Sequence, residues 1–246
     1  MIKEFKKYIE QFGKDENIKL KFQHSLRVKK NCVELGKQLN FNDKDIKAIE
    51  VIRLLHDYGR FEQRKEYHTF YDSISIDHWD LAVKLLFDNN EIGKYYPHED
   101  DYNDIYIAIK YHNKLNIPNN LTKRQKIFLE VIKDADKLDI LYLISIKQIH
   151  FPEEWDVSPK VKKSFDNRSL VNKKDRISGI DIALLKLALI FDFNFNYSLK
   201  YLKDKKIIET IYNNLTDKNK FKYYFDIINE FIELRLNSNQ SKEIYT

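Results

Sequence analysis

The sequence has few of the residues that make tight turns and cross-links. Only 5 glycines, 4 prolines and 1 cysteine occur among its 246 residues. So few glycines and prolines argue against a turn-rich all-β fold. The single cysteine, Cys32, excludes an internal disulfide and a cysteine-based zinc site, and we expect it to be buried on an apolar helical stripe. No GxGxxG or GxxxxGK[ST] string is present, so the common nucleotide-binding loops are unsupported.

The sequence also has no large excess of one charge sign and few long apolar runs. The 43 Lys and Arg residues against 38 Asp and Glu give a formal net charge of +5, without a long basic block. This modest excess is typical of a solvated surface, so nucleic-acid binding is not indicated. The apolar run IDIALLKLALIFDF contains a lysine and is too short to span a bilayer. The N-terminus has no apolar stretch of signal-peptide length, and we expect a soluble, cytoplasmic protein with no membrane association.

Hydrophobic residues repeat with the helical period through most of the chain. They make up 43% of the sequence, which is ample for a globular core. The pattern predicts helices over 24–39, 43–58, 75–88, 101–112, 122–148, 180–192, 197–214 and 218–236. We expect Gly59 to stop the second of these helices. There is no repeat and no convincing strand, so the sequence predicts an all-α fold.

A polar stretch interrupts the helical pattern over residues 151–179. We therefore expect a helical core over residues 1–150, and a polar loop with a C-terminal helical layer over 151–246, packed on the same domain. The cations of the polar stretch are Arg168, Lys173, Lys174 and Arg176. They are consistent with a lid that binds an anionic substrate, but a solvated connection is the simpler interpretation. The sequence does not indicate the oligomeric state.

Histidines on four of the predicted helices lie on or beside apolar faces: His24, His56, His78 and His112. A lone histidine of this kind is most often a core residue that is hydrogen-bonded to a carbonyl. Here Asp57 follows His56, and one very apolar helix carries three acids, Asp134, Asp136 and Asp139. Imidazoles and carboxylates that are buried together need a cation to compensate their charge. Mixed nitrogen and oxygen ligands suit Fe, Mn, Co, Ni or Zn, so the sequence predicts a divalent transition metal as cofactor.

The order of these motifs resembles the HD superfamily of metal-dependent phosphohydrolases. The matching strings are HSLRV at 24–28, LLHDYGRFEQ at 54–63, SISIDHW at 73–79, IKYHNK at 109–114 and KDADKLD at 133–139. The resemblance covers roughly residues 20–145. It implies the family's helical bundle, here with additional C-terminal helices, as the catalytic core.

Position by position, the resemblance implies four primary metal ligands: His24, His56, Asp57 and Asp136. Asp136 is preferred to Asp134 because ADKL matches the A-D-x-L pattern of the family. Asp134 and Asp139 are then interpreted as residues that support the ligands or cap the helix, with plain solvation as the alternative.

The family resemblance also favours a second ion. In members that hold two metals, extra histidines on the intervening helices bind the second ion while the aspartate of the HD pair bridges both. His78 and His112 stand at those places, so we expect two ions. The alternative is a single ion, with His78 and His112 contacting the substrate phosphate.

The resemblance implies that a metal-activated water hydrolyses a phosphomonoester or phosphodiester, expected to be a nucleotide-like small molecule. Asp57 would hold the metal and steer the water. The candidates for binding the phosphate are the cations Arg27, Arg60 and Lys137. Arg60 and Lys137 are also assigned to the catalytic residues. His68 lies in the string RKEYHTFYDSIS, expected to be a loop over the site, and is a further substrate-binding candidate. Each of these residues can equally be an ordinary surface residue.

Two departures from known subgroups limit the assignment. Some nucleotide-hydrolysing members carry a glutamate four residues after the HD histidine, where this chain has Arg60. The HHE…GYP mark of the cyclic-di-GMP-cleaving subgroup is also absent. Two alternative functions stay open: a di-iron oxygenase with the same ligands, and a non-catalytic module that senses a ligand. The remaining histidines considered, His98 and His150, are expected to be structural or exposed.

Overall fold

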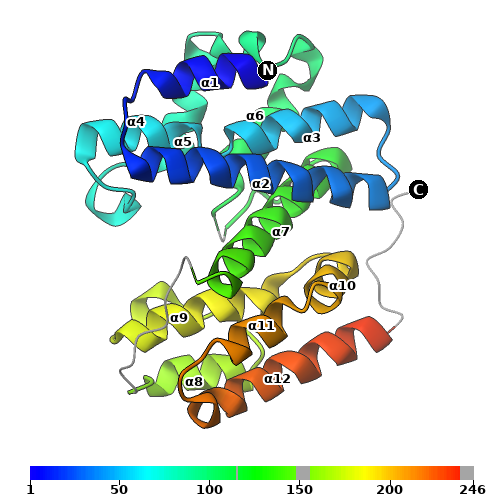
Figure 1. Cartoon of the computed structure of the whole chain (residues 1–246). Coiled ribbons are helices and arrows are strands. Elements are labelled where there is room, and N and C mark those ends of the chain that lie inside the picture. The colour runs from blue at the N-terminus through cyan, green and yellow to red at the C-terminus, as the bar shows by residue number, and fades with distance from the viewer. Residues whose placement is uncertain (115, 148–155, 239–246) are drawn as a thin grey trace. The chain divides into compact units, whose positions relative to one another are not determined.

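The structure is a computed structural model, and it describes residues 1–114, 116–147 and 156–238. Helices account for most of these residues, and the three ranges contain no strand (Figure 1). The prediction of an all-α fold is therefore confirmed.

The chain folds into two compact units, Met1–Ala135 and Asp136–Thr246. Their boundary falls inside one helix, α7 (Lys123–Ser145). The division into a catalytic core ending near residue 150 and a C-terminal layer stays a prediction.

The first unit is built from helices, including two long ones whose starts are set by capping side chains. They are α1 (Ile2–Glu10), α2 (Glu16–Gln38), α3 (Asp43–Leu55), α4 (Tyr58–Tyr67), α5 (His78–Val83), α6 (Tyr102–Tyr111) and the beginning of α7. Helix α2 begins earlier than predicted because the Asp15 side chain accepts a hydrogen bond from the Asn17 amide at 2.7 Å. Asn42 caps α3 in the same way, at 2.9 Å from the Asp45 amide. Helices α2 and α3 then run side by side (Figure 1).

The apolar stripe predicted for α2 forms part of the core. Val28, Cys32 and Leu35 are fully buried, as are Ile49 and Ile52 of α3. The expectation that Cys32 is a small core residue is thus confirmed.

The turn after α3 differs from the sequence-based expectation. Helix α3 ends at Leu55, and α4 begins only three residues later at Tyr58, so Gly59 lies inside a helix and does not stop one. A Cβ atom on Gly59 would lie 2.2 Å from the His78 carbonyl oxygen and 2.7 Å from the Ala82 amide nitrogen. Gly59 is therefore needed because α4 packs directly against the backbone of α5.

The segment between the HD pair and α6 is more ordered than predicted. The string expected to be a loop begins with the end of α4 and contains a one-turn helix, η1 (Asp72–Ile74). The predicted helix over 75–88 is the short α5 followed by one π-helical stretch, Lys84–Asp88. One-turn segments Glu91–Lys94 and Glu99–Asp101 lead into α6.

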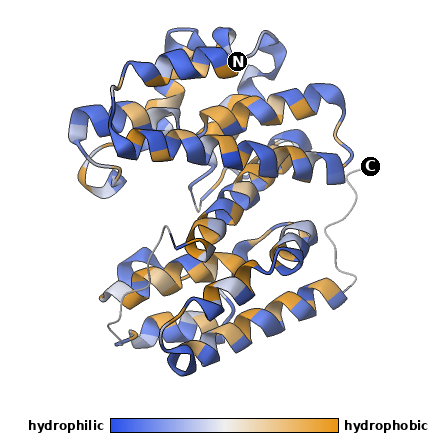
Figure 2. Cartoon of the chain, in the orientation of Figure 1, coloured by the Kyte–Doolittle hydropathy of each residue, from blue (hydrophilic) through white to orange (hydrophobic). Residues whose placement is uncertain are grey.

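The second unit has its own hydrophobic core. Its helices after α7 are α8 (Pro159–Asp166), α9 (Gly179–Leu187), α10 (Asn196–Asp204), α11 (Ile207–Asn213) and α12 (Lys218–Asn237), with one-turn segments Lys173–Asp175 and Ala188–Asp192. Figure 2 shows hydrophobic and hydrophilic residues alternating along α12, as expected of an amphipathic helix. Its Phe225, Ile228 and Ile232 are buried in this core.

Two predictions for the second unit are wrong in detail. The stretch 151–179 is not simply a loop, because α8 forms within it and buries Val161 and Phe165; residues 151–155 lie outside the described residues. The single helix predicted over 197–214 is divided into α10 and α11, because Lys206 adopts a left-handed conformation with φ 53°.

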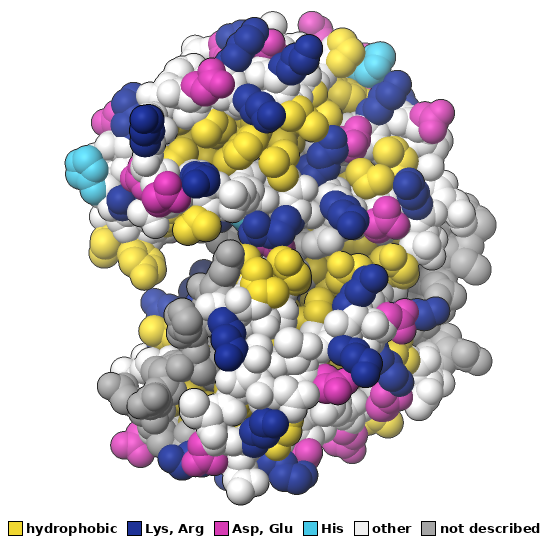
Figure 3. Space-filling model, in the orientation of Figure 1, with side chains coloured by type: hydrophobic (Ala, Val, Ile, Leu, Met, Phe, Trp, Pro, Cys, Tyr) yellow, Lys and Arg dark blue, Asp and Glu magenta, His cyan; other side chains and the backbone are white. Residues whose placement is uncertain are grey.

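Charged side chains are spread over the visible face. Figure 3 shows Lys and Arg interspersed with Asp and Glu. Among the helices of the described ranges, none combines the length and the apolar character that crossing a bilayer requires.

Candidate metal centre

Five of the predicted ligands lie at helix ends or on inner helix faces of the first unit. His24 lies within α2, His56 directly follows α3, and Asp57 directly precedes α4. His78 is the first residue of α5, and His112 directly follows α6. All five are buried, with exposed fractions between 1% for His56 and 7% for His112. Segments far apart in the sequence thus bring ionisable groups into one buried place.

The carboxylate of Asp57 is at the middle of this cluster. Its Oδ2 lies 3.4 Å from Nε2 of His24 and 3.4 Å from Nε2 of His56. Its Oδ1 lies 3.4 Å from Nε2 of His78. The Nε2 atoms of His78 and His112 are 3.2 Å apart. The Nε2 atoms therefore gather around Asp57.

The outer ring nitrogens of two histidines are fixed by the backbone. Nδ1 of His56 lies 2.8 Å from the Arg53 carbonyl oxygen, and Nδ1 of His112 lies 2.7 Å from that of Ile109. A carbonyl oxygen can only accept, so we assign the ring proton of each to Nδ1. In the neutral ring, Nε2 then carries a lone pair directed into the cluster, which is the form that binds a metal.

In His78, the Nδ1 atom is held by a side chain and not by the backbone. Its Nδ1 lies 2.8 Å from Oδ1 of Asp72. Burial lowers the pKa of His78 to about 4 and that of His112 to about 3, so both rings are neutral at pH 7. Two nitrogen lone pairs then face each other at 3.2 Å. They cannot hydrogen-bond to each other, but both can bind one cation, so the donor set fits a metal ion.

Lys21 was not predicted from the sequence but contacts the centre. Its ammonium group forms an ion pair with Oδ2 of Asp57. Burial alone raises the pKa of Asp57, but the charge of Lys21 and the contacts with His56 and His24 outweigh it and hold that pKa well below its ordinary value. The signal for Lys21 is its place on α2 one turn before His24, where both side chains share a helix face.

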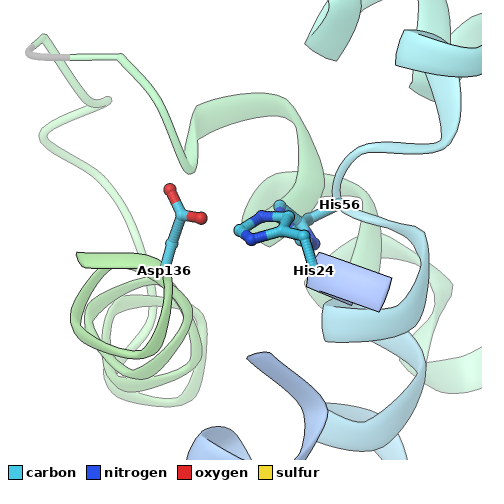
Figure 4. Close-up of side chains that lie close together, drawn as sticks. All are labelled: His24, His56 and Asp136. Atoms are coloured by element: carbon cyan, nitrogen blue, oxygen red, sulfur yellow. The ribbon is translucent and has the colours of Figure 1, made fainter. Parts of the chain in front are cut away.

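Within the described ranges, two groups of three side chains have ligand atoms within 4.8 Å of one another. One consists of His56, Asp57 and His112; the other consists of His24, His56 and Asp136 (Figure 4). The two groups share His56. Asp136 lies on α7, where Asp134 and Asp139 are also buried and so are not simply solvated.

The predicted phosphate-binding residue Arg60 is engaged within its own unit. Its guanidinium donates to both oxygens of Asp72, at 2.8 and 3.1 Å, and to Oε1 of Gln63 at 2.9 Å. It also donates to the Phe70 carbonyl oxygen. We call Arg60, Gln63 and Asp72 the Asp72 network. The sequence did not identify Gln63 or Asp72, because neither falls on a periodic stripe.

The other predicted substrate-binding residues have varied surroundings. Lys137 donates to the Asp192 carbonyl oxygen and lies 2.6 Å from Oδ2 of the same residue. His68 is exposed, at the end of α4, in a left-handed conformation with φ 54°. Arg27 lies on α2, three residues after His24, and is half-buried. Their roles toward substrate stay predictions.

The sequence analysis also considered two further histidines and the cations of the polar stretch. His98 is exposed, as expected. His150 lies outside the described residues. Of the cations in the polar stretch, Arg168 pairs with Glu230 at 2.7 Å within the second unit.

Comparison with known families finds one match. The family model described as the HD domain matches residues 22–141. No curated protein and no solved structure matches the chain significantly. The matched range contains all six predicted metal ligands: His24, His56, Asp57, His78, His112 and Asp136.

Proposed function

We propose that this chain, whose residues 22–141 match the HD-domain family model, is a metal-dependent hydrolase of phosphate esters. Proteins with this domain are mostly metal-dependent hydrolases that bind divalent metals. The substrate that we propose is a phosphomonoester or phosphodiester, of nucleotide-like size.

The gathering of imidazole nitrogens around Asp57 carries this proposal. His78 and His112 present lone pairs to each other at 3.2 Å, and Asp57 presents one oxygen to His56 and the other to His78. Such a set is unfavourable without a cation, because acceptors face acceptors in a buried place. Neutral imidazole with carboxylate is the ligand chemistry of Fe, Mn, Co, Ni and Zn.

We propose two ions, because the ligands form two partly separate sets. His24, His56 and Asp136 would hold one ion, and His78 and His112 the other. Asp57 would bridge them, since its two oxygens face opposite sets. Divalent metal in such a site lowers the pKa of water and neutralises charge that develops on a phosphoryl group.

The chain itself would supply the positive charge that binds the substrate. Lys21 is the cation closest to Asp57, and a metal that takes the Asp57 oxygen would leave its ammonium group available for a phosphate oxygen. Arg27, one turn after His24, is proposed to act beside it. The position four residues after His56 holds Arg60, so no carboxylate at that place can transfer a proton.

The test combines metal analysis with a substrate screen. Protein purified without oxygen is analysed for transition metals and assayed on phosphomonoesters, phosphodiesters and cyclic nucleotides. We expect about two metal ions per chain and release of phosphate or of a nucleoside monophosphate. Asp57→Asn should lose metal and activity with the helical circular dichroism unchanged, whereas Asp88→Asn, at an exposed position, should retain both.

Other outcomes would assign the site differently. Iron-dependent oxygen uptake without phosphate release would favour the di-iron oxygenase. Bound metal without turnover on any ester would favour a ligand-sensing module. An Asp57→Asn variant that keeps its metal and its rate would contradict the proposal.

A further inference from the structure

The turn between α4 and α5 places a carboxylate behind His78. Asp72 lies in η1, six residues before His78, and its Oδ1 accepts from Nδ1 of His78 at 2.8 Å and from the His78 backbone amide at 3.2 Å. His56 and His112 use a peptide carbonyl of their own helix for the same purpose. His78 begins its helix and so has no carbonyl one turn earlier in that helix. A side chain takes its place.

The Asp72 carboxylate is itself held by the other members of the Asp72 network. Arg60 donates to it through two nitrogens, the fork geometry that fixes a carboxylate most firmly. Nε2 of Gln63 donates to the same Oδ1 at 3.1 Å, and also to Oγ of Ser75 at 2.8 Å. Gln63 is fully buried. These bonds leave Asp72 little freedom to rotate.

The contacts of Asp72 also fix the direction of its hydrogen bond with His78. Both of its oxygens face the Arg60 guanidinium, a pairing that holds the carboxylate as the anion, so Asp72 can only accept. The proton that it accepts from His78 must be on Nδ1, which leaves the Nε2 lone pair toward Asp57 and His112.

We propose that Arg60, Gln63 and Asp72 are positioning residues, which fix the ring of His78 in the Nδ1-protonated form as a ligand of the second metal ion. This inference rests on the proposed two-metal function. It assigns Arg60 to the Asp72 carboxylate and not to the substrate phosphate. Partners of this kind contribute about 10- to 100-fold to metal affinity.

The first test reads the tautomer of His78 in metal-free protein by ¹⁵N NMR. We expect Nδ1–H in the wild-type chain, with the signal identified by its loss in His78→Gln. In Asp72→Asn, the new amide can donate to Nδ1, and we expect the ring proton to move to Nε2. A wild-type His78 in the Nε2–H form, or an unchanged tautomer in Asp72→Asn, would overturn the inference.

The second test counts metal ions. Wild-type protein should bind two, and Asp72→Asn should bind one with unchanged affinity and the other about 10- to 100-fold more weakly. The matched control is Asp80→Asn, because Asp80 lies two residues after His78 on α5 but pairs with Lys114 at 3.2 Å. It should bind both ions as the wild type does.

The outcomes separate this inference from the proposed function. A wild-type chain that binds no ion would refute both. Two equally tight ions in Asp72→Asn would refute the inference alone. A wild-type chain with a single ion would refute the inference together with the two-ion part of the proposed function. If Asp72→Asn does not fold, Arg60→Lys replaces it. Lysine keeps a positive charge near Asp57, whose Oδ1 lies 3.6 Å from Nε of Arg60, but loses the two-nitrogen contact with Asp72, so we expect weaker binding of one ion only. If that variant instead raises KM while both ions bind normally, Arg60 contacts substrate and the inference is wrong.

Discussion

At the scale of single residues, the ion pair of Lys21 with Asp57 gives the metal-free centre a positive charge of its own. Lys21 is about one-quarter exposed, whereas Asp57 is almost fully buried. The ammonium group therefore stabilises a carboxylate that would otherwise be desolvated without a counter-charge. A metal ion that binds Asp57 must compete with Lys21 for the same oxygen.

Replacing Lys21 should thus have opposite effects on stability and metal binding. In Lys21→Met we expect the metal-free protein to lose about 2 kcal/mol of unfolding free energy, because Asp57 loses its counter-charge. Metal binding should tighten, because the competitor is gone. Urea unfolding with a chelator and competition with a metal indicator measure the two effects.

Lys29→Met is the matched control for that variant. Lys29 lies on the same helix and forms a similarly part-buried ion pair with Glu50, at 3.1 Å. Its loss should cost some stability and leave metal affinity unchanged. Weaker metal binding in Lys21→Met would show that Lys21 supports the ion and does not compete with it.

The two neutral histidines should make metal-free stability depend on pH. Burial lowers the pKa values of His78 and His112 to about 4 and about 3 in the folded chain, against about 6.5 when unfolded. At pH values between the folded and the unfolded pKa, the unfolded chain binds protons that the folded chain does not. The free energy of unfolding therefore has its full value above about pH 6.5 and falls as the pH is lowered toward 4. Urea midpoints in chelator from pH 7.5 to 4.5 measure this loss.

A variant that lacks one of these histidines separates them from other titrating groups. His78→Gln should lose stability less steeply below pH 6.5, whereas His98→Gln, at an exposed position, should follow the wild type. A midpoint that stays constant over this range would contradict the assignment of neutral rings.

At the scale of elements, Gly59 sets how closely α4 approaches α5, and α5 begins with His78. In Gly59→Ala the added methyl group would overlap the His78 carbonyl, so the two helices must separate. We expect a loss of about 1–3 kcal/mol in unfolding free energy and weaker binding of one metal ion. Thermal denaturation and metal analysis measure these effects.

Gly93 offers a control for that substitution. A Cβ atom there would lie 3.4 Å from the Tyr102 hydroxyl oxygen, which is ordinary contact. Gly93→Ala should keep both the stability and the metal content. A Gly59→Ala variant that behaves in the same way would show that the α4–α5 contact has no influence on His78.

The elements also show which features the sequence could predict. Helices such as α2 and α12 follow from the period of their apolar residues, because each buries one face. Gly59 was misread as a stop because a glycine's sequence context does not distinguish a helix end from a close approach of two backbones. Asp72 was missed because its partner, His78, is brought to it only by the fold. The place of Lys21 one turn before His24 is a sequence signal, but its contact with Asp57 is made only by the fold.

At the scale of the whole molecule, metal binding should raise the stability of the folded chain. An ion that binds only the folded state stabilises it by about 2.7 kcal/mol when free metal is at 100 times its dissociation constant. We expect the melting temperature of chelator-treated protein to rise with added Mn²⁺ or Co²⁺, and Ca²⁺, which prefers oxygen ligands, to have little effect. Equal shifts with Ca²⁺ would contradict a nitrogen-rich site.

Because the chain has a single cysteine, the metal centre also matters for how the chain is cross-linked. A chain with one thiol cannot close a covalent loop, yet the proposed ligands in the first unit extend from His24 to His112. An ion held by them would act as a reversible cross-link between helices α2 to α6. Resistance to proteases would then rise and fall with the supply of metal, so the lifetime of the protein would follow the metal status of its surroundings.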